Sequence, residues 1–118
     1  MAKILIVEDE PGLRRAVERT LRDEGYEILT ATEGREALVL VAAHNPDLVL
    51  TDVDMPHGMG GVELAQTIRR DHPSIPVILW TGGPHARKIA QATQCECFEK
   101  PLDARILVRH YIRQGSSA

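Results

Sequence analysis

Five short apolar runs recur along the chain, separated by stretches in which apolar residues follow a helical spacing. The runs predict β-strands at residues 3–7, 26–31, 48–51, 76–80 and 95–98. The first, third and fourth are almost continuously apolar, which is typical of strands covered on both faces. The second and fifth contain polar residues such as Glu27 and Glu96, which favours positions at the edges of a sheet.

Amphipathic stretches fill the intervals between these strands. The clearest has Leu13, Val17 and Leu21 on one face and stops at Gly25, a residue type that commonly ends helices. Further helices are predicted at about residues 33–44, 61–72, 84–92 and from 102 onward. The fourth of the five helices is short and only weakly apolar.

Regular alternation of strand and helix predicts a parallel sheet with helices on both faces. Right-handed crossovers and short connections leave few strand orders, and the order 2-1-3-4-5 places the two polar-mixed strands at the edges. We therefore expect an α/β fold: a doubly wound five-stranded parallel sheet of the flavodoxin-like (βα)5 type. The domain is expected to span residues 1–114, with 115–118 as a flexible tail.

Acidic residues follow two of the predicted strands, on either side of the point where the strand order reverses. Glu8 and Asp9 follow the first strand, and Asp52 follows the third. Ligands of open α/β sheets bind at this position, where the carboxyl ends of the strands meet. Three carboxylates brought together are unfavourable unless a cation neutralises them, and hard oxygen ligands suit Mg²⁺. The pattern predicts a metal-dependent phosphate site.

Two more polar side chains come at the same edge of the predicted sheet. Thr81 follows the fourth strand and Lys100 follows the fifth. A carboxylate can attack phosphorus and form an aspartyl-phosphate, with Mg²⁺ and Lys100 neutralising the phosphoryl oxygens and Thr81 donating to one of them. Thr81 as the N-cap of the fourth helix is an open alternative. Trp80 is expected to pack in the core and to point away from the site.

With these residues in place, the sequence resembles the response-regulator receiver domains of two-component signalling, over essentially the whole chain. Five motifs match in order: Glu8-Asp9, Asp52, Met55-Pro56, Thr81 and Lys100-Pro101. The resemblance implies that Asp52 is the phosphoacceptor and a Mg²⁺ ligand, beside Asp9 and a water-mediated Glu8. It also implies that the backbone carbonyl of Asp54 completes the metal shell, that Thr81 and Lys100 contact the phosphoryl group, and that the Lys100–Pro101 bond is cis.

The same resemblance implies a set of partners. A sensor histidine kinase or a phosphotransfer protein would donate the phosphoryl group. The face made by the fourth helix, fifth strand and fifth helix would then control a downstream effector or an output domain, and the same face would allow a homodimer. Such a domain is not an enzyme beyond catalysing its own phosphorylation and dephosphorylation.

Three features depart from the receiver pattern. Receivers usually carry an aromatic residue three positions before the lysine, but Cys97 stands there and Phe98 should face the opposite side of the sheet. The segment between Thr81 and Lys100 is short, so the fourth helix should be truncated or irregular. The loop at 55–61 is one residue longer than usual, which its glycines can absorb.

Two other functions stay open at this point. The missing aromatic residue motivates a receiver-like interaction module that works without phosphorylation. The Asp52-Val53-Asp54 sequence resembles the nucleophile motif of haloacid-dehalogenase-type phosphatases, although that motif normally lies on the first strand of a longer chain. Cys95 and Cys97 are expected to be two thiols on one face of a strand rather than a metal site or a disulfide.

Composition and charge exclude few classes of function. A net charge of −3 gives no electrostatic basis for nucleic-acid binding. No apolar run is long enough to span a bilayer and the N-terminus has no signal-peptide layout, so a cytoplasmic location is expected. Four arginines on the first helix form a basic face that is either simply solvated or a docking surface for the kinase: Arg14, Arg15, Arg19 and Arg22.

Overall fold

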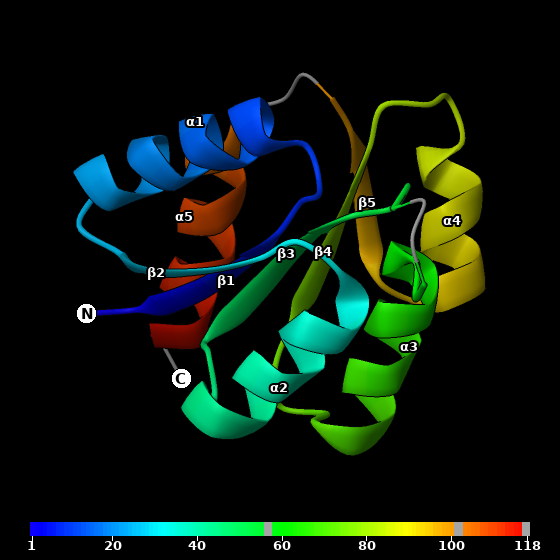
Figure 1. The fold of residues 1–118 in the computed structure, drawn as a ribbon, viewed down its shortest axis with the longest axis horizontal. Coiled ribbons are helices and arrows are strands. Elements are labelled where there is room, and N and C mark those ends of the chain that lie inside the picture. Colours follow the sequence, from blue (N-terminus) through cyan, green and yellow to red (C-terminus); the bar gives the residue numbers. More distant parts are fainter. Residues whose placement is uncertain (56–57, 101–102, 117–118) are drawn as a thin grey trace.

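A five-stranded parallel sheet with the strand order β2-β1-β3-β4-β5 forms the centre of the molecule (Figure 1). The computed structural model describes residues 1–55, 58–100 and 103–116, apart from the side chains of residues 107, 110 and 113–116. The strands are β1 (Lys3–Val7), β2 (Glu27–Ala31), β3 (Leu48–Asp52), β4 (Val77–Thr81) and β5 (Glu96–Glu99). The helices are α1 (Pro11–Asp23), α2 (Gly34–His44), α3 (Gly61–Asp71), α4 (Ala86–Thr93) and α5 (Ala104–Ser116). The predicted fold class and strand order are confirmed.

The sheet separates two hydrophobic clusters. Helices α1 and α5 cover one face, where they pack on residues such as Ile4, Leu50 and Ile78. Helices α2, α3 and α4 cover the other face, where Leu5 and Val49 are fully buried. Successive residues of each strand alternate between the clusters, because side chains of a strand point to opposite faces in turn. This alternation decides which face each residue at the strand ends occupies.

Three predicted strands end one residue too early. β3 continues to Asp52, β4 to Thr81 and β5 to Glu99, because parallel pairing extends that far: Asp52 lies opposite Trp80, and Thr81 opposite Glu99. The predicted starts at residues 26, 76 and 95 were also one residue too early. Asp52 and Thr81 are therefore anchored in the sheet by strand pairing and are not parts of loops.

Helix boundaries follow local capping chemistry. The carboxylate of Glu10 accepts hydrogen bonds from the amides of Gly12 and Leu13 and so caps α1. Helix α4 has 8 residues against 13 in α1, which confirms the predicted truncation. Its N-cap is His85, so the alternative that Thr81 caps this helix is wrong. Helix α5 extends to Ser116, two residues past the predicted domain boundary.

Gly61 lets the start of α3 approach the end of β3. A Cβ atom at this position would lie 2.0 Å from the carbonyl oxygen of Asp52, a distance that no side chain can tolerate. The Gly61 amide donates to the Val53 carbonyl across 3.1 Å. Gly58, in the connection between β3 and α3, has φ +69°, a conformation that favours glycine. The glycines thus shape the backbone on the C-terminal side of Asp52.

Within the described ranges of the chain, no helix is both long enough and apolar enough to cross a membrane.

Candidate functional site

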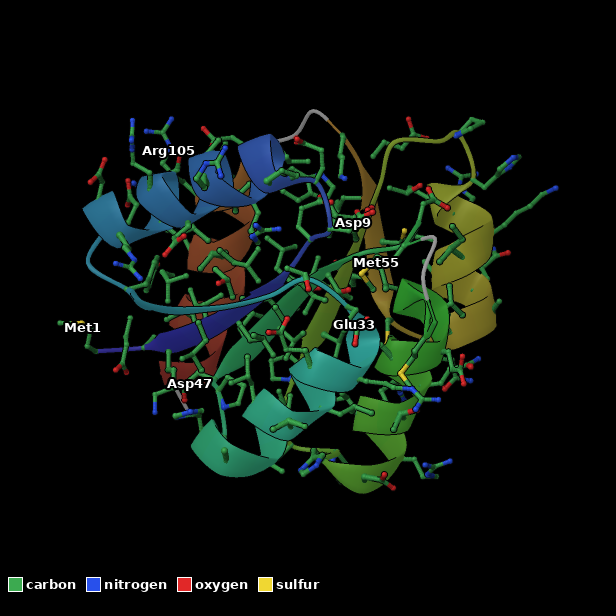
Figure 2. All side chains as sticks on the ribbon, viewed as in Figure 1. Met1, Asp9, Glu33, Asp47, Met55 and Arg105 are labelled. Carbon is green, nitrogen blue, oxygen red and sulfur yellow. The ribbon has the colours of Figure 1, made fainter. Side chains whose placement is uncertain are left out.

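Three carboxylates meet where β1 and β3 end. Ligand oxygens of Glu8, Asp9 and Asp52 all lie within 4.8 Å of one another. Glu8 is 5% exposed and Asp52 7%, so two of the three acids are largely removed from water. Figure 2 shows Asp9 at this edge of the sheet, near Met55 and far from Met1 and Asp47 at the other end. The predicted convergence of these acids is confirmed.

Lys100 bridges the two buried carboxylates. Its Nζ lies 2.9 Å from Oε1 of Glu8 and 3.1 Å from Oδ1 of Asp52. Burial raises the pKa of Glu8, an effect that the hydrogen bond from Lys100 partly offsets. Burial acts to lower the pKa of Lys100, but its contacts with Glu8 and Asp52 outweigh that effect and raise it. Lys100 is therefore a charged partner of Asp52, as predicted.

The set of residues present fits a divalent cation. Three carboxylates face a single ammonium group, which leaves excess negative charge in a partly buried site. Carboxylate oxygens are the donors that Mg²⁺ prefers. The acidic cluster therefore has the oxygen donors and the excess negative charge that suit a Mg²⁺ site.

Trp80 belongs to this site, contrary to expectation. It is buried as predicted, but Nζ of Lys100 lies over its ring, 5.7 Å from the ring centroid. The prediction that Trp80 points away from the site is wrong because Asp52 and Trp80 are paired across β3 and β4. Paired residues of neighbouring parallel strands project to the same face, here the α1–α5 face.

Thr81 projects to the opposite face of the sheet. Its hydroxyl donates to Oδ2 of Asp54 over 3.5 Å and accepts a 3.1 Å hydrogen bond from the amide of Gly83. Among the described residues, the side-chain partner of Thr81 is therefore Asp54 and not Asp52. The sequence placed Thr81 at the correct edge but did not indicate this contact.

Cys97 occupies the place where receivers usually have an aromatic residue. It packs in the cluster under α2, α3 and α4, whereas Phe98 packs in the opposite cluster, as predicted. Burial, together with the nearby charges of Asp54 and Glu99, raises the pKa of the Cys97 thiol to about 11. Cys95 joins the same cluster as Cys97 and both thiols are free, which confirms the predicted arrangement.

Arg14 is a site-supporting residue that sequence analysis placed only on a basic helix face. Its guanidinium donates to the backbone carbonyl of Glu8 across 3.0 Å and holds the connection between β1 and α1. No pattern of apolar and polar positions indicates this contact, because it depends on the angle at which α1 leaves β1. Pro56 and Pro101, and with them the predicted cis bond, lie outside the described residues.

The fold and the acidic edge define a doubly wound α/β domain with a candidate metal site at the carboxyl edge of its sheet, and the comparison with known proteins gives the family. A family model described as the response regulator receiver domain matches residues 4–111, so the chain belongs to that family. It is the receiver domain of two-component response regulators, a signalling domain.

Named relatives agree with this assignment. The chain is 36% identical over 109 residues to the nitrogen assimilation regulatory protein NtrX of Azorhizobium caulinodans, covering 89% of this chain and 24% of NtrX. It is 36% identical to the response regulator TrrA of Thermotoga maritima, solved in complex with Mg²⁺ and BeF, with a TM-score of 0.83 and coverage of 96% of this chain and 98% of TrrA. A receiver domain from Clostridium thermocellum gives a TM-score of 0.87 at 27% identity, with 98% of both chains covered. The chain spans about a quarter of the length of NtrX.

Proposed function

We propose that Asp52 accepts a phosphoryl group from the phosphohistidine of a sensor histidine kinase or a phosphotransfer protein. The observation that carries this proposal is the position of Lys100, whose ammonium lies 3.1 Å from Oδ1 of Asp52 and 2.9 Å from Glu8. An ammonium held beside a carboxylate nucleophile at the end of a central strand is suited to stabilise charge on an incoming phosphoryl group.

The reaction at Asp52 is a direct transfer. One carboxylate oxygen of Asp52 attacks phosphorus, a P–O bond forms, and the P–N bond to the donor histidine breaks. The electron pair of the broken bond stays on the imidazole nitrogen. Lys100 remains at the phosphoryl oxygens through the transfer, because its second partner, Glu8, keeps it at the site. The Thr81 hydroxyl exchanges its long contact with Asp54 for a phosphoryl oxygen.

The metal ligands in this proposal are Glu8, Asp9 and Asp52, together with the backbone carbonyl of Asp54. Mg²⁺, when bound, supplies positive charge that neutralises phosphoryl oxygens. The chain's own part is to gather the oxygen ligands. Asp52 is fixed by its pairing with Trp80, and the Glu8 amide donates to the Ala31 carbonyl across 3.0 Å. Arg14 holds the backbone that leads to Asp9.

Phosphorylation would shift the population of two conformations of the face made by α4, β5 and α5. That face would control a downstream effector or an output domain of a longer protein, and it would be the surface for a homodimer. The relatives' greater length supports an output region, because NtrX is about four times as long as the part that aligns.

Intact-mass measurement tests the proposal. Incubation with acetyl phosphate and Mg²⁺ should add the mass of one phosphoryl group to the wild-type chain and none to Asp52→Asn. Asp47→Asn is the matched control, since Asp47 is an exposed acid at the opposite end of the sheet. An adduct that survives Asp52→Asn would contradict the proposal, and turnover of a small phosphate ester would favour the phosphatase alternative.

A further inference from the structure

We propose that Trp80 is a positioning residue for phosphoryl transfer: its indole face holds the Lys100 ammonium beside Asp52 through a cation–π contact. The role in transfer rests on the proposed function of Asp52. The contact itself is a property of the resting protein and can be measured separately.

The geometry meets the requirements of such a contact. Nζ of Lys100 lies over the ring at 5.7 Å from its centroid, within the range of about 6 Å over which the attraction acts. Trp80 is only 7% exposed, and the Lys100 side chain is 20% exposed. Weak access to water strengthens the attraction between a cation and a ring face.

Backbone pairing fixes both partners. Trp80 lies opposite Asp52 on one side and opposite Phe98 on the other, and the Trp80 and Phe98 side chains pack in the same cluster. The amide of Lys100 donates to the carbonyl of Thr81 across 2.7 Å, so Lys100 begins directly beside the end of β4. The ring and the ammonium are thus brought together by the sheet itself.

A hydrogen bond from the indole nitrogen does not explain the orientation of the Trp80 ring. The indole Nε1 of Trp80 is buried and has no acceptor among the residues that the structure describes. Buried donors are nearly always paired, so an orientation that leaves this one unpaired needs another stabilising contact. The face of the ring supplies one, because it is the part that Lys100 meets.

A neutral aromatic ring suits this position chemically. The lysine side chain is long and flexible, so the carboxylates of Glu8 and Asp52 alone would let the ammonium move from one to the other. The ring attracts the ammonium without adding a fourth negative charge to a site that already gathers Glu8, Asp9 and Asp52. Trp80 therefore restricts Lys100 while leaving the carboxylates free for metal and phosphoryl ligands.

The competing explanation is that Trp80 only fills the core. Fluorination of the ring distinguishes core filling from a cation–π contact. Fluorine withdraws electron density from the ring face and so weakens its attraction for a cation, while the ring keeps its shape and nearly its size. Trp80 is the single tryptophan of the chain, so biosynthetic incorporation of fluorotryptophans alters this ring alone. A matched series is available in tryptophan, 5-fluorotryptophan and 4,5,6,7-tetrafluorotryptophan.

The experiment measures the rate of phosphorylation by acetyl phosphate across the series, with thermal unfolding of each protein as the control for packing. We expect the rate to fall stepwise, by roughly three- to tenfold at the last member, with little change in unfolding temperature. Equal rates in proteins that are all phosphorylated would overturn the proposal and leave the proposed function intact.

A second readout needs no phosphoryl donor. The ε-methylene protons of Lys100, assigned by comparison with Lys100→Arg, should resonate upfield of other lysines in the unmodified protein because of the ring current. Their absence from that region would overturn the contact. Failure of the wild-type chain to form any adduct would overturn the proposed function and the role in transfer together, whereas the upfield shift would still report the contact.

Discussion

The two faces of the sheet differ sharply where its strands end. On the α1–α5 face, Lys100 lies within 3.1 Å of two largely buried carboxylates and over a buried ring. On the α2–α4 face, Thr81 reaches Asp54 only over 3.5 Å, and Asp54 is exposed. Short, multiple contacts therefore hold Lys100 beside the two carboxylates, whereas Thr81, the proposed phosphoryl ligand on the other face, has one long side-chain contact.

The difference in contacts between the two faces corresponds to two requirements of a receiver domain. Phosphoryl chemistry needs groups that do not move, because charge stabilisation depends on donors that are already in place. A switch needs groups that exchange partners at small cost in free energy. The Thr81 hydroxyl has one long side-chain contact to give up, to Asp54, and Cys97 replaces the bulky residue usual in receivers, so we expect the α2–α4 face to be the one that rearranges.

The largest predicted effect on the free energy of unfolding concerns the close approach between the start of α3 and the end of β3. Gly61→Ala places a Cβ atom 2.0 Å from the carbonyl oxygen of Asp52, and only movement of α3 or of β3 can relieve the overlap. We expect the free energy of unfolding to fall by at least about 3 kcal/mol, measured by urea denaturation.

Gly60→Ala is the matched control for that substitution. The nearest atom to a Cβ at position 60 is the Val53 carbonyl oxygen at 3.8 Å, and φ is −77°, which alanine adopts readily. The expected change is within about 1 kcal/mol. A large effect at position 60, or none at position 61, would show that β3 and α3 do not approach as described.

An intermediate effect on the free energy of unfolding is expected from Mg²⁺ binding to the carboxylates of Glu8, Asp9 and Asp52. At a hundredfold excess of Mg²⁺ over its dissociation constant, the free energy of unfolding should rise by about 2.7 kcal/mol. Asp9→Asn should remove most of this gain, because it deletes one of three converging carboxylates, whereas Asp47→Asn should keep it. A gain that is equal in all three proteins would place the metal elsewhere.

The smallest effect concerns the thiol of Cys97, on the α2–α4 face, and depends on pH. Because burial, Asp54 and Glu99 all oppose the thiolate, alkylation of Cys97 in a Cys95→Ala background should reach half its limiting rate near pH 11, not near the usual 9. Asp54→Asn should shift this midpoint downward, since it removes one of the opposing charges. A midpoint near 9 in the folded wild-type background would contradict the described environment of Cys97.

The sequence predicted the parts of the site that depend on strand order. Apolar runs placed Glu8, Asp52 and Lys100 just after or at the carboxyl ends of β1, β3 and β5, and the parallel order brought these ends to one edge of the sheet. What it missed depends on register, because a shift of one residue exchanges the faces. Trp80 was assigned away from the site because its neighbour Thr81 was expected to face it, whereas Trp80 is the residue that pairs with Asp52.

Two side-chain contacts also could not be predicted from the sequence. The bond from Arg14 to the Glu8 carbonyl depends on the exact angle at which α1 leaves β1, and the bond between Thr81 and Asp54 depends on the connection after β3. Neither angle is encoded in a pattern of apolar and polar positions. The departures at Cys97 and in the short α4 were readable because they depend on residue type and chain length alone.

In the proposed function, Asp52 carries the phosphoryl group beside Lys100. The most direct test is to treat the phosphorylated chain with borohydride, which reduces an aspartyl-phosphate to homoserine, and to locate the product by peptide mass spectrometry. We expect homoserine at position 52 and unmodified aspartates at positions 9 and 54. Homoserine at either of those positions, or at none, would contradict it.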